Sequence, residues 1–298
     1  AIDDPVPSHI REAVQRGADL ILSVSIDNVD AVARHVEPET AYVLVAPPGL
    51  SPSEKLEALR HLSEELEARG AEKLILDPLL EPPMESGLFR SLMAYDLVAR
   101  ELPGKPMMMG FCNVSELLDA DSPGVNALLA CLAAELGVSL VLTTEESPKT
   151  RRSTYEAGVA LKMASLALLG HRAPKDLGLD LLVLKDKVDK TIQFGPELLK
   201  GAIEVGCGPA RGPTYKPDPM GFFRITVDEA SNSIMALYEG RRGKVLLRGP
   251  DATSVVRCVL DMGLASTPEH VAYLARELTK AELALRIGKS YVQDEPLF

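Results

Sequence analysis

The sequence contains no tryptophan, only five histidines and only four cysteines. None of the cysteines forms a CxxC pair, so neither a zinc ligand set nor a disulfide framework is indicated. Widely spaced free thiols are typical of a reducing compartment, and we expect a cytoplasmic protein without a bound metal. These thiols are Cys112, Cys131, Cys207 and Cys258.

Basic residues are in the minority, since 32 Lys and Arg face 43 Asp and Glu, for a net charge of -11. A surface of this charge repels phosphate backbones and anionic lipid, so we expect neither a nucleic acid nor a membrane partner. Long apolar runs are also lacking. The most apolar stretch, residues 125–142, is interrupted by Glu135 and Gly137, which excludes a transmembrane helix. No signal peptide is visible.

The first part of the chain, residues 1–172, repeats a unit of one strand and one helix. Each strand is a short apolar run without polar alternation, which indicates that both of its faces are covered. Spacings of roughly 20–35 residues match successive βαβ units and favour a parallel sheet. The runs begin near Asp19, Ala41, Lys73, Pro106 and Val138.

A helix is expected after each strand. The residues SPSE at 51–54 form a capping box that predicts a helix start, and the apolar stripe of this helix is Leu56, Leu59, Leu62 and Leu66. A later helix starts at Ser122 and ends at Gly137, and it is expected to bury Val125, Leu128, Leu129, Leu132 and Leu136.

A doubly wound sheet and a barrel both fit this repeat. The segment after the first strand, residues 26–33, contains no glycine, so the phosphate-binding loop of a doubly wound sheet is lacking. Polar residues instead follow several strands, among them Ser25, Asp77, Asn113 and Thr143. Barrels build their sites in this way. We therefore expect an α/β fold of the (β/α)8 TIM-barrel type.

The barrel is expected to be incomplete at its N-terminus. Such barrels take about 250 residues, whereas the repeat accounts for strands four to eight, with residues 1–3 as the end of strand three. We expect a fragment, or one half of a split protein. The edge at residues 19–25 would expose unpaired backbone groups. A partner segment or a second subunit would cover that edge, or the chain would self-associate as a homo-oligomer.

Residues 173–298 have a different pattern and predict a C-terminal α+β domain of unknown role. A hairpin, a further strand and two helices are expected, the second helix starting near Ser266 with Pro268 in its first turn. Glu282 and Arg286 are spaced as an i,i+4 ion pair. His270 is expected at the helix start or on the surface.

The sequence predicts a role for two connecting segments of this domain. Thr253 or Ser254 is expected to cap the first of the two helices. The loop at residues 206–213, rich in Gly and Pro, is either an anion-binding nest around Cys207 or a flexible loop, and the second is favoured.

Asp77 is a carboxylate at the end of a buried strand, where it costs free energy unless it is paired or hydrogen-bonded. Its two oxygens could accept from two adjacent N–H donors of a flat heterocycle. A pterin offers such a pair, its exocyclic amine and its ring N3–H. Alternatively, Asp77 caps the next turn and Pro78 fixes the backbone. The residues alone leave both interpretations open.

Asn113 and Ser115 stand at the mouth of the following strand. An amide can donate and accept at one place, which suits a ring nitrogen and its protonated form. The alternative is an Asx turn that shapes the loop.

Two stretches carry a resemblance to a known family. ILDPLLEP at residues 75–82 and MMMGFCNVSELLDADSPGVNALLACLAAELG at residues 107–137 resemble the pterin-binding barrel family. That family contains dihydropteroate synthase and the methyltetrahydrofolate–corrinoid methyltransferases. The loops are most similar to the methyltransferases, with a DPL strand end, GFCNVS at residues 110–115 and an Asn on the next helix. As a whole the chain resembles dihydropteroate synthase-related proteins.

The resemblance implies a reduced pterin of the tetrahydrofolate or tetrahydromethanopterin type as substrate or ligand, and group transfer in one-carbon metabolism. Methyl transfer with a corrinoid protein as partner and a non-catalytic pterin-binding scaffold are alternatives. Asn113 is the implied catalytic residue. The implied pterin ligands are Asp77, Asn113, Ser115, Asn126 and Ser25. Candidates for a second substrate are Asp3, Thr143, Glu145 and Arg151.

The chain departs from dihydropteroate synthases at three places. Residues 112–114 read CNV where those enzymes carry Ser-Arg-Lys, and residues 142–147 read LTTEES where they carry Arg-x-His. Leu22 and Ser23 replace the Asn of the fourth strand. The lost basic groups neutralise a leaving diphosphate, so ordinary dihydropteroate synthesis is disfavoured. Arg151 and its neighbour Arg152 could substitute for them.

Overall fold

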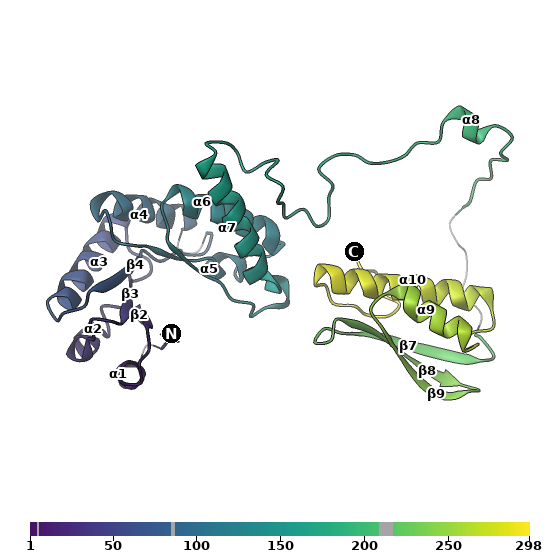
Figure 1. Cartoon of the computed structure of the whole chain (residues 1–298), viewed down its shortest axis with the longest axis horizontal. Helices are drawn as coiled ribbons and strands as arrows, with labels where there is room; N and C mark the ends of the chain where they lie inside the picture. The colour runs from purple at the N-terminus through teal and green to yellow at the C-terminus, as the bar shows by residue number, and fades with distance from the viewer. Residues whose placement is uncertain (5, 85–86, 209–216) are drawn as a thin grey trace. The chain divides into compact units, whose positions relative to one another are not determined.

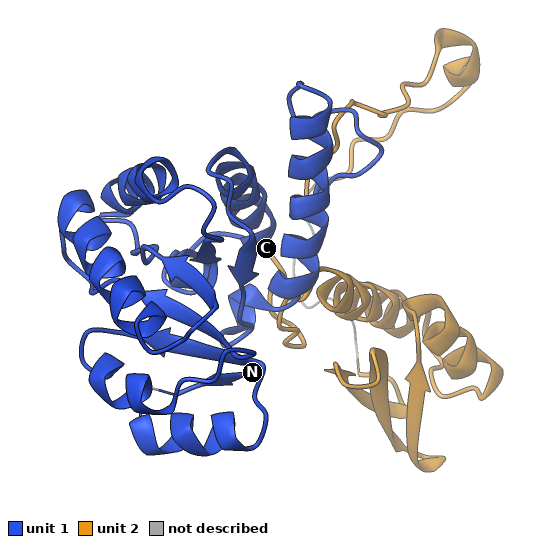
Figure 2. Cartoon of the chain, turned by 60° about the vertical axis from the view of Figure 1, so that its left-hand side comes forward, with its two compact units in different colours: residues 1–182 blue, residues 183–298 orange. Residues whose placement is uncertain are grey.

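The computed structural model describes residues 1–298 apart from residues 5, 85–86 and 209–216. The described chain divides into two compact units, Ala1–Leu182 and Val183–Phe298 (Figure 2). The division follows Leu182 rather than the expected residue 172. Most of the predicted loop at 206–213 lies outside the described residues.

The described part of unit 1 contains six short strands, each parallel to its neighbours (Figure 1). They pair in chain order, and a parallel bridge between Leu76 and Met107 connects the fourth to the fifth. A doubly wound sheet would reverse its order at a switch point. The unbroken order therefore indicates a TIM-barrel-like sheet. The strands are β1 (Ile2–Asp3), β2 (Leu20–Val24), β3 (Ala41–Val45), β4 (Lys73–Asp77), β5 (Met108–Gly110) and β6 (Leu140–Leu142).

The five strands expected between residues 19 and 145 are confirmed as adjacent and parallel. Residues 1–3 were expected to end a preceding strand, and β1 does pair with β2, through Ile2 with Ile21 and Asp3 with Leu22. The edge at residues 19–25 is therefore covered at these two positions rather than open along its length.

The strands of unit 1 bury apolar side chains on both faces, as their lack of polar alternation predicts. On one face the helices pack against the sheet, and Ile21, Leu44 and Leu76 are fully buried there. On the other face Val43, Ile75 and Met108 form a smaller cluster with partly buried side chains of β2 and β6. That second cluster has the place of the inner layer of a barrel.

The helices of unit 1 alternate with its strands. They are α1 (Pro7–Gln15), α2 (Val29–Val32), η1 (Ala33–His35), α3 (Pro52–Glu67), α4 (Leu88–Glu101), α5 (Cys112–Ser115), α6 (Ser122–Glu135), η2 (Pro148–Thr150) and α7 (Ser153–Leu169). In α3 the predicted capping box is present, because Ser51 and Glu54 each accept from the other's backbone N–H. No helix in the described part of the chain is long and apolar enough to cross a membrane.

One buried position of α6 was predicted wrongly. Leu128 was expected in the core, but it is 64% exposed, while Leu129, Ala130 and Ala133 are buried. The sequence of α6 is apolar nearly all round, so its pattern does not say which side faces the core. Packing against α7 decides the buried side.

Unit 2 contains a three-stranded antiparallel sheet with two helices packed on one face. A short helix, α8 (Pro196–Leu199), precedes it. The sheet comprises β7 (Gly221–Asp228), β8 (Ser233–Gly240) and β9 (Gly243–Gly249), and the helices are α9 (Ala252–Asp261) and α10 (Pro268–Ile287). Figure 1 shows both helices on the same side of the strands. Glu282 and Arg286 form the predicted ion pair.

His270 lies at the start of α10, as one of its two expected positions required, but it is 1% exposed and so is not on the surface. Asp218, which precedes β7, lies 3.0 Å from its Nδ1. A second expectation in unit 2 is wrong. The cap of α9 is Asp251, whose carboxylate accepts from the Ser254 N–H at 2.7 Å, rather than Thr253 or Ser254. In each case a carboxylate makes the deciding contact, Asp218 with His270 and Asp251 with the Ser254 N–H.

Candidate functional site

Five candidate residues lie at or just after the carboxyl ends of the parallel strands of unit 1. Because carboxyl ends of parallel strands lie at one edge of a sheet, these residues share one rim of unit 1. We call this set the carboxyl rim. It comprises Asp3 (β1), Ser25 (after β2), Asp77 (β4), Asn113 (after β5) and Thr143 (after β6).

Asp77 is buried at this rim, with 4% of its surface exposed. Its Oδ1 accepts from the Leu79 N–H and from the Tyr95 hydroxyl, each at 2.8 Å. Burial raises the pKa of Asp77 to about 6, although the bonds from Tyr95 and Leu79 oppose the rise. Both hydrogen bonds from described residues end on Oδ1. Oδ1 therefore caps the turn at Leu79, as the turn interpretation expects, whereas Oδ2 is available to a ligand.

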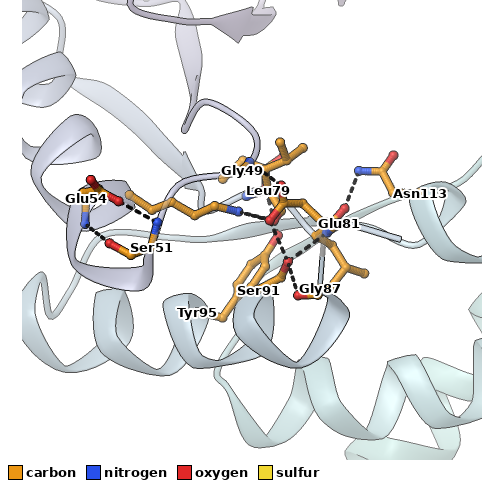
Figure 3. Close-up of polar contacts among 12 residues, drawn as sticks. Gly49, Ser51, Glu54, Leu79, Glu81, Gly87, Ser91, Tyr95 and Asn113 are labelled. Carbon is orange, nitrogen blue, oxygen red and sulfur yellow. Dashed lines mark hydrogen bonds and ion pairs between the residues drawn. The ribbon is translucent and has the colours of Figure 1, made fainter. Parts of the chain in front are cut away.

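Asn113 connects two neighbouring loops of the rim. Its Nδ2 donates to the Leu80 carbonyl at 2.8 Å, and its Oδ1 lies 3.6 Å from the Cys112 sulfur (Asn113 is labelled in Figure 3). A Cβ at Gly110 would come within 3.2 Å of the same amide nitrogen. Gly110 thus leaves the space that the Asn113 side chain occupies.

Two other predicted pterin ligands have polar atoms without a partner. Ser115 is 2% exposed, and its Oγ has no hydrogen bond among the described residues. Asn126 is fully buried, and its Oδ1 is likewise without a partner in the described chain. The Nδ2 of Asn126 donates to Ser153 Oγ at 2.8 Å and to Glu156 Oε2 at 3.1 Å. These bonds join Asn126 to α7 and not to Asp77 or Asn113.

The fifth pterin candidate, Ser25, and one second-substrate candidate lie at the ends of β2 and β1. The Ser25 N–H donates to the Asn28 side chain at 2.9 Å, which shapes the loop after β2. Asp3 accepts from the Ser23 hydroxyl at 2.9 Å. The contact of Asp3 links β1 to β2, so the structure places it in the rim without a bond to Asp77.

The other second-substrate candidates gather where α7 begins. Glu145 accepts from the Arg152 N–H at 2.9 Å and the Thr154 N–H at 3.2 Å, and these bonds lower the pKa of Glu145. Thr143 and Thr154 are joined through their hydroxyls at 3.2 Å. Arg151 follows η2 directly. Two amides at the start of α7, that of its N-cap residue Arg152 and that of Thr154, are therefore occupied by a carboxylate of the chain itself.

Sequence reasoning missed Glu116, which orders the loop after β6. It accepts from the hydroxyls of Thr144, Ser147 and Thr150 and from two backbone N–H groups in that loop. Burial raises its pKa, but the bonds from Ser147 and Thr150 outweigh that effect and lower it to about 2. The donors come from residues 144–150, about 30 positions away, and leave no local signal at Glu116.

Lys55 and Glu81 were also missed. Lys55 occupies a position of the apolar stripe of α3, four residues before Leu59, and it is 1% exposed. A lysine on such a stripe is a usable signal, because it must find a buried partner. That partner is Glu81, in the loop after Asp77. Among the described residues, no group of three or more His, Cys, Asp or Glu is arranged to hold a metal.

Comparison with known proteins gives one match to a family. Residues 217–294 match the family PterinBD-DUF4346. The matched residues lie within unit 2. The expected resemblance to pterin-binding proteins is confirmed to that extent.

The similar proteins differ in how much of the chain they cover. An uncharacterized protein of Methanocaldococcus jannaschii, MJ0107, is 33% identical over 310 residues, and the alignment covers all of this chain. The chain spans 58% of the length of that relative. The uncharacterized protein ycf91 of Pyropia yezoensis is 29% identical over 85 residues, which is 26% of this chain and 73% of that protein.

Among solved structures, the dihydropteroate synthase of Thermus thermophilus, in complex with 4-aminobenzoate, is similar to this chain. It is 20% identical, with a TM-score of 0.36, over 53% of this chain and 71% of that one. The order and direction of the strands, rather than this likeness, support the TIM-barrel-like fold.

Proposed function

We propose that unit 1 binds a reduced pterin at the carboxyl rim and transfers a group to or from it. The observation that carries the proposal is the buried carboxylate of Asp77, which has one oxygen engaged by the chain and one available. An amino group and a ring N–H side by side would satisfy that oxygen and offset the cost of a buried charge. Pterins have this donor pair.

Asn113 is the proposed catalytic residue. Its Nδ2 carries two hydrogens, of which one is used by the Leu80 carbonyl, so a donor remains for a ligand. In methyl transfer, the methyl group moves to the acceptor, the N5–methyl bond breaks and its electron pair stays on N5, which then takes a proton from water. The free N–H of Asn113 would donate to N5 where that negative charge develops. The buried Ser115 hydroxyl, without a partner in the described chain, is proposed as a further pterin ligand beside it.

Methyl transfer is favoured over coupling at a pterin diphosphate. The N-terminus of a helix is the usual binding place for a phosphate, but at α7 the carboxylate of Glu145 already accepts from those amides. Asp3, Thr143, Glu145 and Arg151 would then border an acceptor such as a corrinoid carried by a partner protein. One-carbon metabolism of the folate or tetrahydromethanopterin type is the corresponding setting.

A second candidate is a pterin-binding scaffold subunit without catalysis. It is supported by the sequence at residues 112–114 and 142–147, where no basic residue follows β5 or β6 to neutralise a leaving group. We also propose that further strands, from a partner segment or a second subunit, complete the sheet next to β1. Light scattering with and without such a segment tests this, and a monomer that binds pterin unaided contradicts it.

Transfer assays separate the two functions. The full chain is incubated with methyl-labelled reduced pterin and a corrinoid acceptor, and in parallel with labelled pterin diphosphate and an arylamine. A loss of methyl transfer in Asn113→Ala that is much larger than its loss of pterin affinity supports the first proposal. Transfer from the diphosphate alone contradicts the preference for methyl transfer. Binding without either transfer supports the scaffold.

A further inference from the structure

Lys55 and Glu81 form an ion pair that is almost completely shielded from water. Their Nζ and Oε2 atoms are 2.9 Å apart, and the side chains are 1% and 2% exposed. Removing two charges from water costs more than such a pair commonly returns, so a pair of this kind is weak evidence for stability alone. The contacts of the pair indicate another role.

The pair joins the loop after β4 to α3, to α4 and to the loop that precedes α3 (Figure 3). Glu81 accepts from the Gly49 N–H at 2.6 Å, in the loop that precedes α3, and from the Ser91 hydroxyl of α4 at 3.3 Å. Lys55, near the start of α3, donates to the Leu79 carbonyl at 3.1 Å. The ion pair thus holds the loop at Leu79, in its middle, and at Glu81, at its end.

Leu79 connects the ion pair to the candidate site, because it contacts both Lys55 and Asp77. Its φ of 64° lies in the left-handed region, which is unfavourable for a side chain of this size. Its N–H donates to Asp77 Oδ1 and its carbonyl accepts from Lys55, so the strained residue is held from both sides. The next carbonyl, that of Leu80, accepts from Asn113. One loop conformation therefore determines the orientation of Asp77 and of Asn113.

We propose that Lys55 and Glu81 are positioning residues for the pterin site, which hold the loop of residues 77–81 so that Asp77 and Asn113 contact the same ligand. This inference rests on the proposed function. The pair supplies no contact to the ligand; its role is to keep the loop in the one conformation in which Asp77 Oδ2 remains available.

The test variant is Lys55→Met/Glu81→Gln, which removes both charges and keeps the side-chain shapes. The matched control is Lys73→Met/Glu39→Gln, since Lys73 begins β4 and forms an exposed ion pair with Glu39 at 2.8 Å. Both variants are expected to unfold at a denaturant concentration close to that of wild type. Affinity for tetrahydrofolate, measured by calorimetry, is expected to fall at least about tenfold in the test variant only.

The pH profile of binding gives a readout that a merely structural role would not move. The charge of Lys55 lowers the pKa of Asp77, whose other neighbours are the Tyr95 hydroxyl and the Cys112 thiol. Without Lys55, the carboxylate forms only at higher pH. The midpoint of tetrahydrofolate binding is therefore expected to move to higher pH in the test variant and to stay unchanged in the control.

Hydrogen exchange tests the positioning without any pterin. The Leu79 N–H is expected to exchange at least about tenfold faster in the test variant, while the Leu76 N–H, which donates to the Pro106 carbonyl, keeps its protection. Suppose that the Leu79 N–H exchanges faster in the test variant but that the wild-type protein binds no pterin. That result contradicts the proposed function, while it supports the role of Lys55 and Glu81 in holding the loop. If the double variant fails to fold, Glu81→Gln alone takes its place. The proposal is overturned if the variant that folds has the same Leu79 N–H exchange rate and the same affinity for tetrahydrofolate as wild type.

Discussion

The hydroxyl oxygen of Tyr95 lies 2.8 Å from Asp77 Oδ1 and 2.9 Å from the carbonyl oxygen of Met108. A phenol has one hydrogen and cannot donate fully to two acceptors. The Tyr95 hydrogen is therefore shared between the two acceptors, so its bond to Asp77 is weaker than an unshared one. Burial raises the pKa of Asp77 to about 6, although the bond from Tyr95 opposes the rise.

The first prediction concerns pH. Asp77 binds its proton more tightly in the folded chain than in the unfolded chain, where its pKa is about 3.8. Its contribution to stability is therefore fully present below about pH 4 and is lost as pH rises through about 6, with an upper bound of about 3 kcal/mol. Pterin affinity should change in the opposite direction, because binding requires the carboxylate.

The measurement is the unfolding free energy and the pterin affinity between about pH 5 and 7.5, for wild type and for Asp77→Asn. The Asn side chain keeps the bond from Leu79 and carries no charge. As pH rises, the unfolding free energy of wild type should fall relative to that of Asp77→Asn, because only wild type loses the proton of Asp77. Affinity that is independent of pH in wild type contradicts the assigned role.

Tyr95→Phe tests the arrangement beside Asp77. The variant leaves the Met108 carbonyl without its donor in a buried place, so the unfolding free energy should fall by about 1–3 kcal/mol. The pKa of Asp77 should rise further, because Tyr95 lowers it. Urea unfolding gives the first quantity, and Tyr155→Phe, at a 62% exposed position of α7, is the control. Equal stability of the Tyr95 and Tyr155 variants would speak against the arrangement.

Gly110→Ala is expected to damage the site while the fold is kept. The new Cβ would meet Asn113 Nδ2 at 3.2 Å and its Cγ at 3.4 Å, so the amide must shift from the Leu80 carbonyl. Pterin affinity should fall several-fold. Gly124→Ala is the matched control, because a Cβ there meets nothing within 4 Å and alanine favours the helix. Similar affinity in both variants would contradict the placement of Asn113.

In unit 2, Asp218→Asn should destabilise the packing of α10 against the sheet. Asp218 accepts from the Ser266 N–H at 2.6 Å and the Ser266 hydroxyl at 2.5 Å, and it contacts His270. Although burial raises its pKa, these bonds hold the pKa well below its usual range. Its stabilisation is therefore present above about pH 4 and is lost as pH falls further.

Loss of this charged acceptor should cost about 1–3 kcal/mol at pH 7. Hydrogen exchange of the amides in β7 and β8 reports unit 2 by itself. Asp261→Asn, at an exposed position at the end of α9, is the control. Unchanged protection in Asp218→Asn would mean that the cluster does not hold α10.

The strands and most helix ends could be predicted from the sequence because their signals are local. Apolar runs without alternation located the parallel strands, and the Ser51–Glu54 capping box located the start of α3. Asp77 and Asn113 could be chosen as candidates because their positions after buried strands are costly or unusual for polar groups. The direction in which a uniformly apolar helix faces is not local, and Leu128 was misplaced for that reason.

The contacts that order the loops of the rim could not be predicted in the same way. Lys55 meets Glu81 across 26 residues, and Glu116 meets its donors across about 30, so neither spacing follows a helix or strand period. His270 looked like a surface residue because its partner, Asp218, lies 52 positions earlier. In each case tertiary packing places a buried charge beside its partner.

The most direct test of pterin binding at Asp77 is a calorimetric isotherm for a reduced pterin on the full chain at about pH 7.5, measured for wild type and for Asp77→Asn. Charge-assisted hydrogen bonds contribute roughly 1.5–3 kcal/mol each, so the variant should bind at least about tenfold more weakly than wild type. Saturable binding by wild type with that loss is the predicted result. Equal affinities of the two proteins, or no binding by wild type, would contradict the proposed site.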